Sequence, residues 1–114
     1  MAEQVTDKEL NNARQEREKI VKKINAVIVP GTVLVMPTAP CIAPKLDAES
    51  AALESFRSNT MALTCIAGLA GLPQISMPVL AVDGCPAGVS LVGAPGSDEQ
   101  LLKLASYFTT NTVL

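Results

Sequence analysis

The side chains of this sequence that could make or break bonds are hydroxyls, amines, thiols and carboxylates, because the 114 residues include no histidine. A Ser-His-Asp triad, a Cys-His pair and a histidine general base are therefore excluded. A Ser-Lys hydrolase remains possible in principle, since a desolvated lysine can activate a serine.

Ser90, Lys45 and Lys103 are the candidates for that pair. Ser90 alternates with apolar neighbours in a run typical of a strand, so we interpret it as a core or edge hydroxyl. Lys45 lies in a loop and Lys103 on an amphipathic helix, where solvated amines are expected. The run GVSLVG at 88–93 is one residue too long for a G-x-S-x-G elbow, and there is no S-x-x-K motif. We predict no catalytic residue in this chain.

Metal and nucleotide sites are not indicated either. Cys41, Cys65 and Cys85 form no C-x-x-C pair and have no histidine to join them as ligands, so no metal site is expected. Gly68 and Gly71 form a G-x-x-G without the lysine of a phosphate loop or the third glycine of a dinucleotide loop, so close helix packing and capping explain them. We expect no cofactor. With no signal peptide at the N-terminus, the thiols are interpreted as reduced, packed side chains of a cytoplasmic protein.

The order of apolar periods predicts helix, strand, helix, strand, strand, helix: an α/β fold in which helices cover a mixed β-sheet. Thr6 and Glu9 form a capping box that opens the first helix, whose apolar stripe predicts that one face covers a sheet. Ser97 and Gln100 form a second capping box. We predict one domain over residues 1–114, with helices at about 7–28, 48–71 and 98–108 and strands at about 32–36, 74–82 and 87–93.

Glycines and prolines are expected to mark the ends of these elements. Gly71 suits a left-handed helix end, and Asp83 with Gly84 predicts a tight turn. Structural roles are predicted for Gly68, Gly71, Pro73, Pro78, Gly84 and Gly88.

The segment 37–44 contains Pro37, Pro40 and Pro44, which stiffen a loop at the C-terminal end of a strand. Ligands tend to bind at that end of open α/β sheets. We predict a substrate-pocket wall made by Thr38, as a polar contact, with Ala39 and Pro40. The alternative is a rigid connector without a binding role.

Composition excludes two other classes of partner. A net charge of −2 and only three aromatic residues do not fit a nucleic-acid interface, which needs clustered basic side chains and stacking platforms. The uncharged stretches 24–44 and 58–82 are long enough to cross a bilayer, but prolines interrupt both. No nucleic acid and no membrane span are expected.

Four sequence blocks resemble the C-terminal portion of the amidase signature family. They are VMPTAP at 35–40, CIAGLAGLPQISMPV at 65–79, DGCPAGVSLVG at 83–93 and SDEQLLKLA at 97–105, and they are most similar to indole-acetamide and acylamide amidases. The resemblance implies hydrolysis of carbon-nitrogen bonds in small linear amides by a Ser-cisSer-Lys arrangement. In that family the catalytic segment lies upstream of the part matched here.

The resemblance therefore implies an amidase fragment that is inactive alone, acting on an amide only in the complete enzyme. Its expected partner is a complementary amidase N-terminal half or a second copy of itself, because lone strands of a larger sheet leave edges and apolar faces exposed. Two alternatives stay open: a non-catalytic binding or self-association module derived from an amidase, and a truncated gene product.

Overall fold

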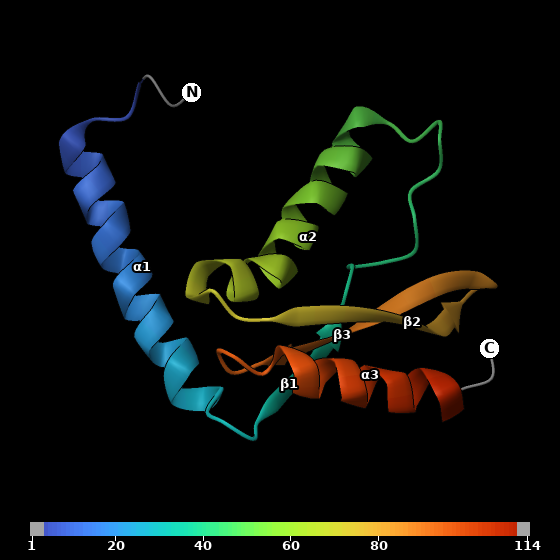
Figure 1. The fold of residues 1–114 in the computed structure, drawn as a ribbon. Helices are drawn as coiled ribbons and strands as arrows, with labels where there is room; N and C mark the ends of the chain where they lie inside the picture. Colours follow the sequence, from blue (N-terminus) through green and yellow to red (C-terminus); the bar gives the residue numbers. More distant parts are fainter. Residues whose placement is uncertain (1–3, 112–114) are drawn as a thin grey trace.

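The computed structural model describes residues 4–111 as three helices and three strands (Figure 1). The predicted α/β class and the predicted order of elements are confirmed. The elements are α1 (Asp7–Val27), β1 (Val33–Pro37), α2 (Ser50–Ala70), β2 (Gln74–Val82), β3 (Cys85–Gly93) and α3 (Asp98–Asn111).

The three strands form one sheet in the order β1-β3-β2, and both pairings are antiparallel. A mixed sheet was expected, and this part of the expectation is corrected. β1 and β2 do run in the same direction and are joined by the helical crossover α2, as a parallel pair would be. The hairpin that follows β2 inserts β3 between them, so every adjacent pair is antiparallel.

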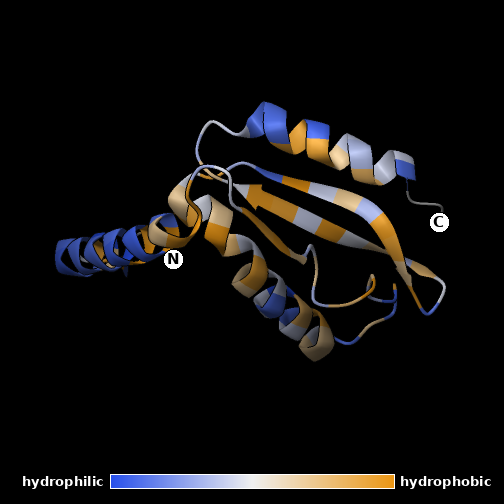
Figure 2. Ribbon diagram, turned by 90° about the horizontal axis from the view of Figure 1, so that it is seen from below, coloured by the Kyte–Doolittle hydropathy of each residue, from blue (hydrophilic) through white to orange (hydrophobic). Residues whose placement is uncertain are grey.

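Helix α3 covers one face of the sheet, and the C-terminal end of α2 packs on the other face (Figure 2). Val92 of β3 packs toward α2 and its neighbour Leu91 packs toward α3, since successive strand side chains alternate between faces. Both are essentially inaccessible to solvent, which marks β3 as the central strand. The α2-side cluster is Ile28, Met36, Ala67, Leu72 and Val92, and the α3-side cluster is Met77, Leu91, Leu101 and Ala105.

Helix α1 begins at the predicted capping box. The Glu9 amide donates to Thr6 Oγ1 at 3.3 Å, and the Thr6 amide donates to Glu9 Oε2 at 2.8 Å. This backbone hydrogen bond holds the pKa of Glu9 below its ordinary value of 4.5. The expectation that α1 covers a sheet with one face is wrong: α1 has no buried residue and extends away from the sheet (Figure 1).

The observed bounds differ from the predicted ones by a few residues. The N-cap of α2 is Glu49, which makes no side-chain capping bond. The helix therefore begins at Ser50, slightly later than the expected start at about 48. β3 starts at Cys85 and includes Pro86, which pairs with Ala81. In a hairpin with a two-residue turn, the second pair from the turn does not exchange backbone hydrogen bonds. Pro86 therefore takes no hydrogen bond from the ladder with β2, although its nitrogen carries no hydrogen.

The chain is extended and thin for its mass. Its radius of gyration is 17.0 Å and its extents are 52 × 43 × 18 Å, whereas a compact chain of this length has a radius of gyration of about 13 Å. Its accessible surface is 8522 Å², against about 6,000 Å² for a compact monomer of 11.9 kDa. About 2,500 Å² of surface is thus exposed beyond what a compact fold of this size would show.

Candidate functional site

Three hydroxyl groups meet where β1 ends. Thr38 Oγ1 lies 2.7 Å from Ser76 Oγ of β2 and 2.8 Å from Ser90 Oγ of β3. Ser90 is fully buried, whereas Ser76 is exposed. We call Thr38, Ser76 and Ser90 the strand-end cluster. It connects all three strands of the sheet by side-chain hydrogen bonds.

The sheet register brings this cluster together. Next to the Asp83-Gly84 turn, Val82 faces Cys85, but beyond Met77 the register has shifted by one residue, which places Ser76 opposite Ser90. The shift is a β-bulge in which Pro78 and Val79 of β2 lie opposite one residue of β3.

Gly88 is the β3 residue opposite the bulge, and its lack of a side chain makes room for the cluster. A Cβ atom there would lie 2.7 Å from Thr38 Oγ1 and 3.0 Å from Ser76 Oγ. The Thr38 amide also donates to the Gly88 carbonyl at 3.0 Å. The predicted structural role of Gly88 thus has a specific geometry: it allows Thr38 to approach β3 closely.

A cavity of about 870 Å³ lies next to the cluster. Thr38, Ala39 and Pro40 all line it, together with Phe56 of α2 and Leu80 of β2. Its other lining residues are mainly apolar, from the loop 41–44 and the hairpin end of the sheet. The space suits an apolar group, with Thr38 as the member of the strand-end cluster that lines it.

No base accompanies these hydroxyls in the described part of the chain. Every lysine between residues 4 and 111 is exposed, including Lys45 and Lys103. Lys19 is bound by Glu16 at 2.7 Å on the surface of α1, and this contact lowers the pKa of Glu16. The strand-end cluster can therefore donate and accept hydrogen bonds but has no group positioned to take a proton from a serine.

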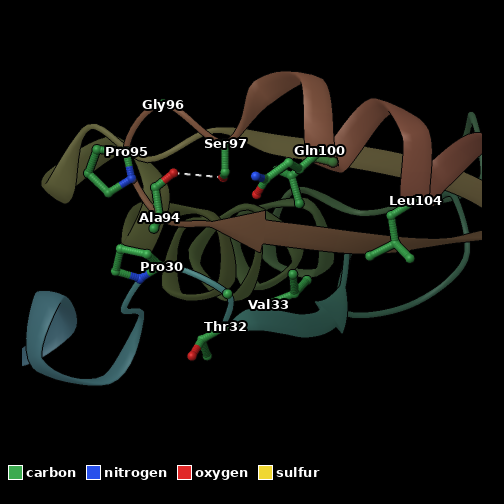
Figure 3. Close-up of a pocket in the computed structure, with 11 residues that line it drawn as sticks. Pro30, Thr32, Val33, Ala94, Pro95, Gly96, Ser97, Gln100 and Leu104 are labelled. Atoms are coloured by element: carbon green, nitrogen blue, oxygen red, sulfur yellow. Dashed lines mark hydrogen bonds between the residues drawn. The ribbon is translucent and has the colours of Figure 1, made fainter.

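A second cavity, of about 220 Å³, lies between the start of β1 and the start of α3 (Figure 3). Val33, Ala94 and Leu104 line it. The Ser97 hydroxyl donates to the Ala94 carbonyl at 2.7 Å (Figure 3) rather than capping at Gln100, so the predicted second capping box is wrong. A turn formed by residues 94–97 leads directly into α3, and the Ser97 side chain closes it.

The other predicted structural residues have distinct surroundings. Gly71 ends α2 with φ 64°, and Gly84 has φ 75° beside Asp83 with φ 50°, which fits a type I′ hairpin turn. The Pro73 carbonyl accepts from the Gly93 amide at 3.1 Å. A Cβ at Gly68 would meet nothing within 4 Å, so the expected close packing at that position is wrong.

The three cysteines are free, and Cys41 is exposed in the proline-rich loop rather than packed as expected. Across residues 4–111, no three side chains of the metal-binding types gather. None of the helices described is both long and apolar enough to pass through a bilayer.

Sequence reasoning missed Ser76 and Gly93 as parts of these sites. A Cβ at Gly93 would collide with Ser97 Oγ, so Gly93 makes room for the turn before α3. For Ser76, the only available signal was Pro78, which favours a bulge.

Comparison with known proteins gives consistent results. The family model described as Amidase matches residues 1–102. The chain is 38% identical over 99 residues to Amidase 1 of Arabidopsis thaliana, covering 87% of this chain and 23% of that protein. It is 29% identical over 99 residues to Outer envelope protein 64, chloroplastic, of the same organism, covering 87% of this chain and 17% of that protein.

Among solved structures, the chain resembles a glutamyl-tRNA(Gln) amidotransferase structure from Thermotoga maritima with a TM-score of 0.77 and 28% identity. The match covers 90% of this chain and 22% of that one. The chain thus spans about a fifth of the length of the proteins that it matches.

Proposed function

Because the chain belongs to the amidase family, we propose that it is part of an amidase-type hydrolase that cleaves carbon-nitrogen bonds in small linear amides when the rest of the enzyme is supplied. In this proposal the chain contributes core strands and one wall of the substrate pocket. The nucleophile and its base come from elsewhere, so the chain alone is inactive.

The observation that supports the proposed inactivity of the chain alone is a cluster of hydroxyls without a base. A serine becomes a nucleophile only when a neighbouring group accepts its proton or lowers its pKa. Ser90 is buried and hydrogen bonded to Thr38, while Lys45 and Lys103 are exposed. The strand-end cluster therefore fits a positioning role and not an attacking one.

The pocket wall is the second part of the proposal. Thr38, Ala39 and Pro40 line the cavity of about 870 Å³, which is within the usual range for ligand sites. Its apolar lining suits the carbon skeleton of an amide, and the Thr38 hydroxyl would contact a polar group of the substrate. Prolines on both sides of Thr38 and Ala39 hold the loop in an extended form.

A hydrolysis assay tests the absence of catalytic residues. The purified chain is incubated with indole-3-acetamide, and release of ammonia is measured for the wild type and for Ser90→Ala. We expect both to remain at the rate of the buffer blank, because removal of a true nucleophile costs about a millionfold in one serine hydrolase. Hydrolysis by the wild type that is lost in Ser90→Ala would overturn the proposal.

The second candidate function is a binding or self-association module derived from an amidase. The large exposed surface favours it, because about 2,500 Å² beyond a compact fold is available for an interface. A cytoplasmic location and the absence of a nucleic-acid partner remain predictions. One relative is named for the chloroplast outer envelope, so family membership does not determine the compartment.

A further inference from the structure

We propose that α1 is a self-association surface whose apolar stripe pairs, in antiparallel orientation, with α1 of a second copy of this chain. The inference rests on the second candidate function, self-association, and specifies the surface and the geometry of the pair. It concerns the chain alone and uses neither the strand-end cluster nor the cavity beside it.

The residues of α1 follow the heptad spacing of a coiled coil. Positions separated alternately by three and four residues lie on one side of a helix, and in α1 all but one of them are apolar. α1 has 21 residues, the length of three heptads. We call these positions the α1 stripe: Leu10, Ala13, Arg17, Ile20, Ile24 and Val27.

Most of the α1 stripe is uncovered in the chain alone. Leu10 and Ile20 are each 41% exposed, and Val27 is 69% exposed. Ile24 packs partly against the α2-side cluster, but α1 as a whole extends away from the sheet (Figure 1). A regular stripe of exposed apolar side chains is a surface that a second helix can cover along its whole length.

α2 meets α1 on one flank of this stripe. Arg14 and Val21 on that flank line a cavity of about 570 Å³ with residues 69–71 at the end of α2. Arg17, the charged member of the stripe, donates from Nε to the Leu69 carbonyl at 3.1 Å. Its guanidinium is therefore held against α2, and the flank of the stripe opposite α2 stays free.

Charge selects the antiparallel orientation. The free flank carries Glu16 and Lys23, both exposed and one heptad apart. Two antiparallel copies can be aligned so that Leu10 of each meets Val27 of the other. Glu16 of each copy then lies opposite Lys23 of the other, and two-fold symmetry forms this pair twice. A parallel pair would instead place the two Arg17 side chains in the same layer, where like charges repel.

The surface is large enough for a stable dimer. α1 is about 30 Å long, and a second α1 of the same length can cover the stripe from end to end. The chain exposes about 2,500 Å² beyond a compact fold, whereas a specific interface buries about 800 Å² on each partner.

Analytical ultracentrifugation of the full 114-residue chain tests the pairing. We expect the wild type to form a dimer. Glu16→Lys and Lys23→Glu each turn both attractive pairs into repulsive ones, so each should raise the Kd of the dimer by about tenfold at low ionic strength. An equimolar mixture of these two variants again places opposite charges at both pairs, and it should dimerise like the wild type.

Two further variants separate the stripe from the rest of α1. Glu18→Lys is the matched control: it makes the same charge change and also loses an attraction to a lysine four residues on, but it lies away from the stripe and should dimerise like the wild type. Ile20→Gln removes an apolar stripe residue without lowering helix propensity, and it should raise the Kd by about tenfold or more. Since α1 has no buried residue, all these chains should keep the wild-type circular dichroism spectrum.

Two results would overturn the inference and differ in what they leave standing. A dimer whose Kd is unchanged by Glu16→Lys and Ile20→Gln, or whose charge variants do not pair with each other, would leave self-association but exclude this surface. A chain that is monomeric at about 1 mM would exclude self-association as well. If that monomer bound the portion of Arabidopsis Amidase 1 upstream of its match to this chain, the α1 stripe would belong to the interface with the rest of an enzyme.

Discussion

Gly88 lies where the three strands are close together. The hydroxyls of Thr38 and Ser76 occupy the space that a side chain at this position would need. A methyl group there would force Thr38 to rotate away. Rotation would break its bonds to both serines and leave the buried Ser90 hydroxyl without a partner. The strand-end cluster therefore depends on a glycine at this position.

We predict that Gly88→Ala lowers the free energy of unfolding by about 1–3 kcal/mol, from overpacking and from the unpaired Ser90 hydroxyl. Urea unfolding followed by circular dichroism measures the change. Gly68→Ala is the matched control: it lies within α2 and its Cβ meets nothing within 4 Å, so it should stabilise by about 0.5–1 kcal/mol. Equal effects of the two substitutions would contradict the proposed role of Gly88.

At this scale the sequence predicts some residues and not others. Thr38 was predicted as a polar residue of a pocket wall because it lies between prolines after a strand. Ser76 could not be placed, because counting back from the Asp83-Gly84 turn without a bulge pairs it with Leu91. The bulge shifts the register by one residue, and its position depends on tertiary contacts that a local pattern does not contain.

Among the elements, α1 depends most on its own local interactions, because none of its residues is buried. Its capping box contains a titrating group. The hydrogen bond from the Thr6 backbone, followed by that from the Thr6 side chain, favours the charged form of Glu9 and lowers its pKa from 4.5. The folded pKa is thus below the unfolded one, so the stabilisation is present above pH 4.5 and is lost as the pH falls through the folded pKa.

We therefore predict that the first turn of α1 frays as the pH falls below 4.5. The protection factors of the amides of residues 7–10, measured by NMR hydrogen exchange and referred to the intrinsic exchange rate at each pH, should decrease in that range in the wild type. Glu9→Gln keeps an acceptor at the same position without a titrating group, and it should remove the contribution of Glu9 to the pH dependence. It also separates this effect from that of Glu16, whose lowered pKa falls in the same range. If the two chains fray identically, the account of the cap is wrong.

Element order could be read from the sequence because helical and strand periods are separated by glycine and proline signals. Two features could not. The antiparallel pairing of β1 with β3 depends on β3 folding back between β1 and β2, which periodicity does not show. The position of α1 away from the sheet was also unpredictable, because an apolar stripe indicates that a surface will be covered but not which surface covers it.

For the whole molecule, the size of the exposed surface connects the fold with the proposed function. The radius of gyration of 17.0 Å and the uncovered edge of β1 fit a segment of a larger sheet better than a self-sufficient compact domain. The comparisons agree, since the match covers nearly all of this chain but only about a fifth of its relatives. The proposed pocket wall, which has no base beside it, fits the contribution of such a segment.

Complementation of amide hydrolysis tests the central claim most directly. The chain and a probe, which is the portion of Arabidopsis Amidase 1 upstream of its match to this chain, are assayed with indole-3-acetamide, separately and mixed. A control probe has alanine in place of the serines of the family's Ser-cisSer-Lys arrangement. We predict ammonia release only from the mixture with the intact probe. Hydrolysis by this chain alone, or by the mixture with the probe that lacks the catalytic serines, would contradict the claim that the catalytic groups lie outside these 114 residues.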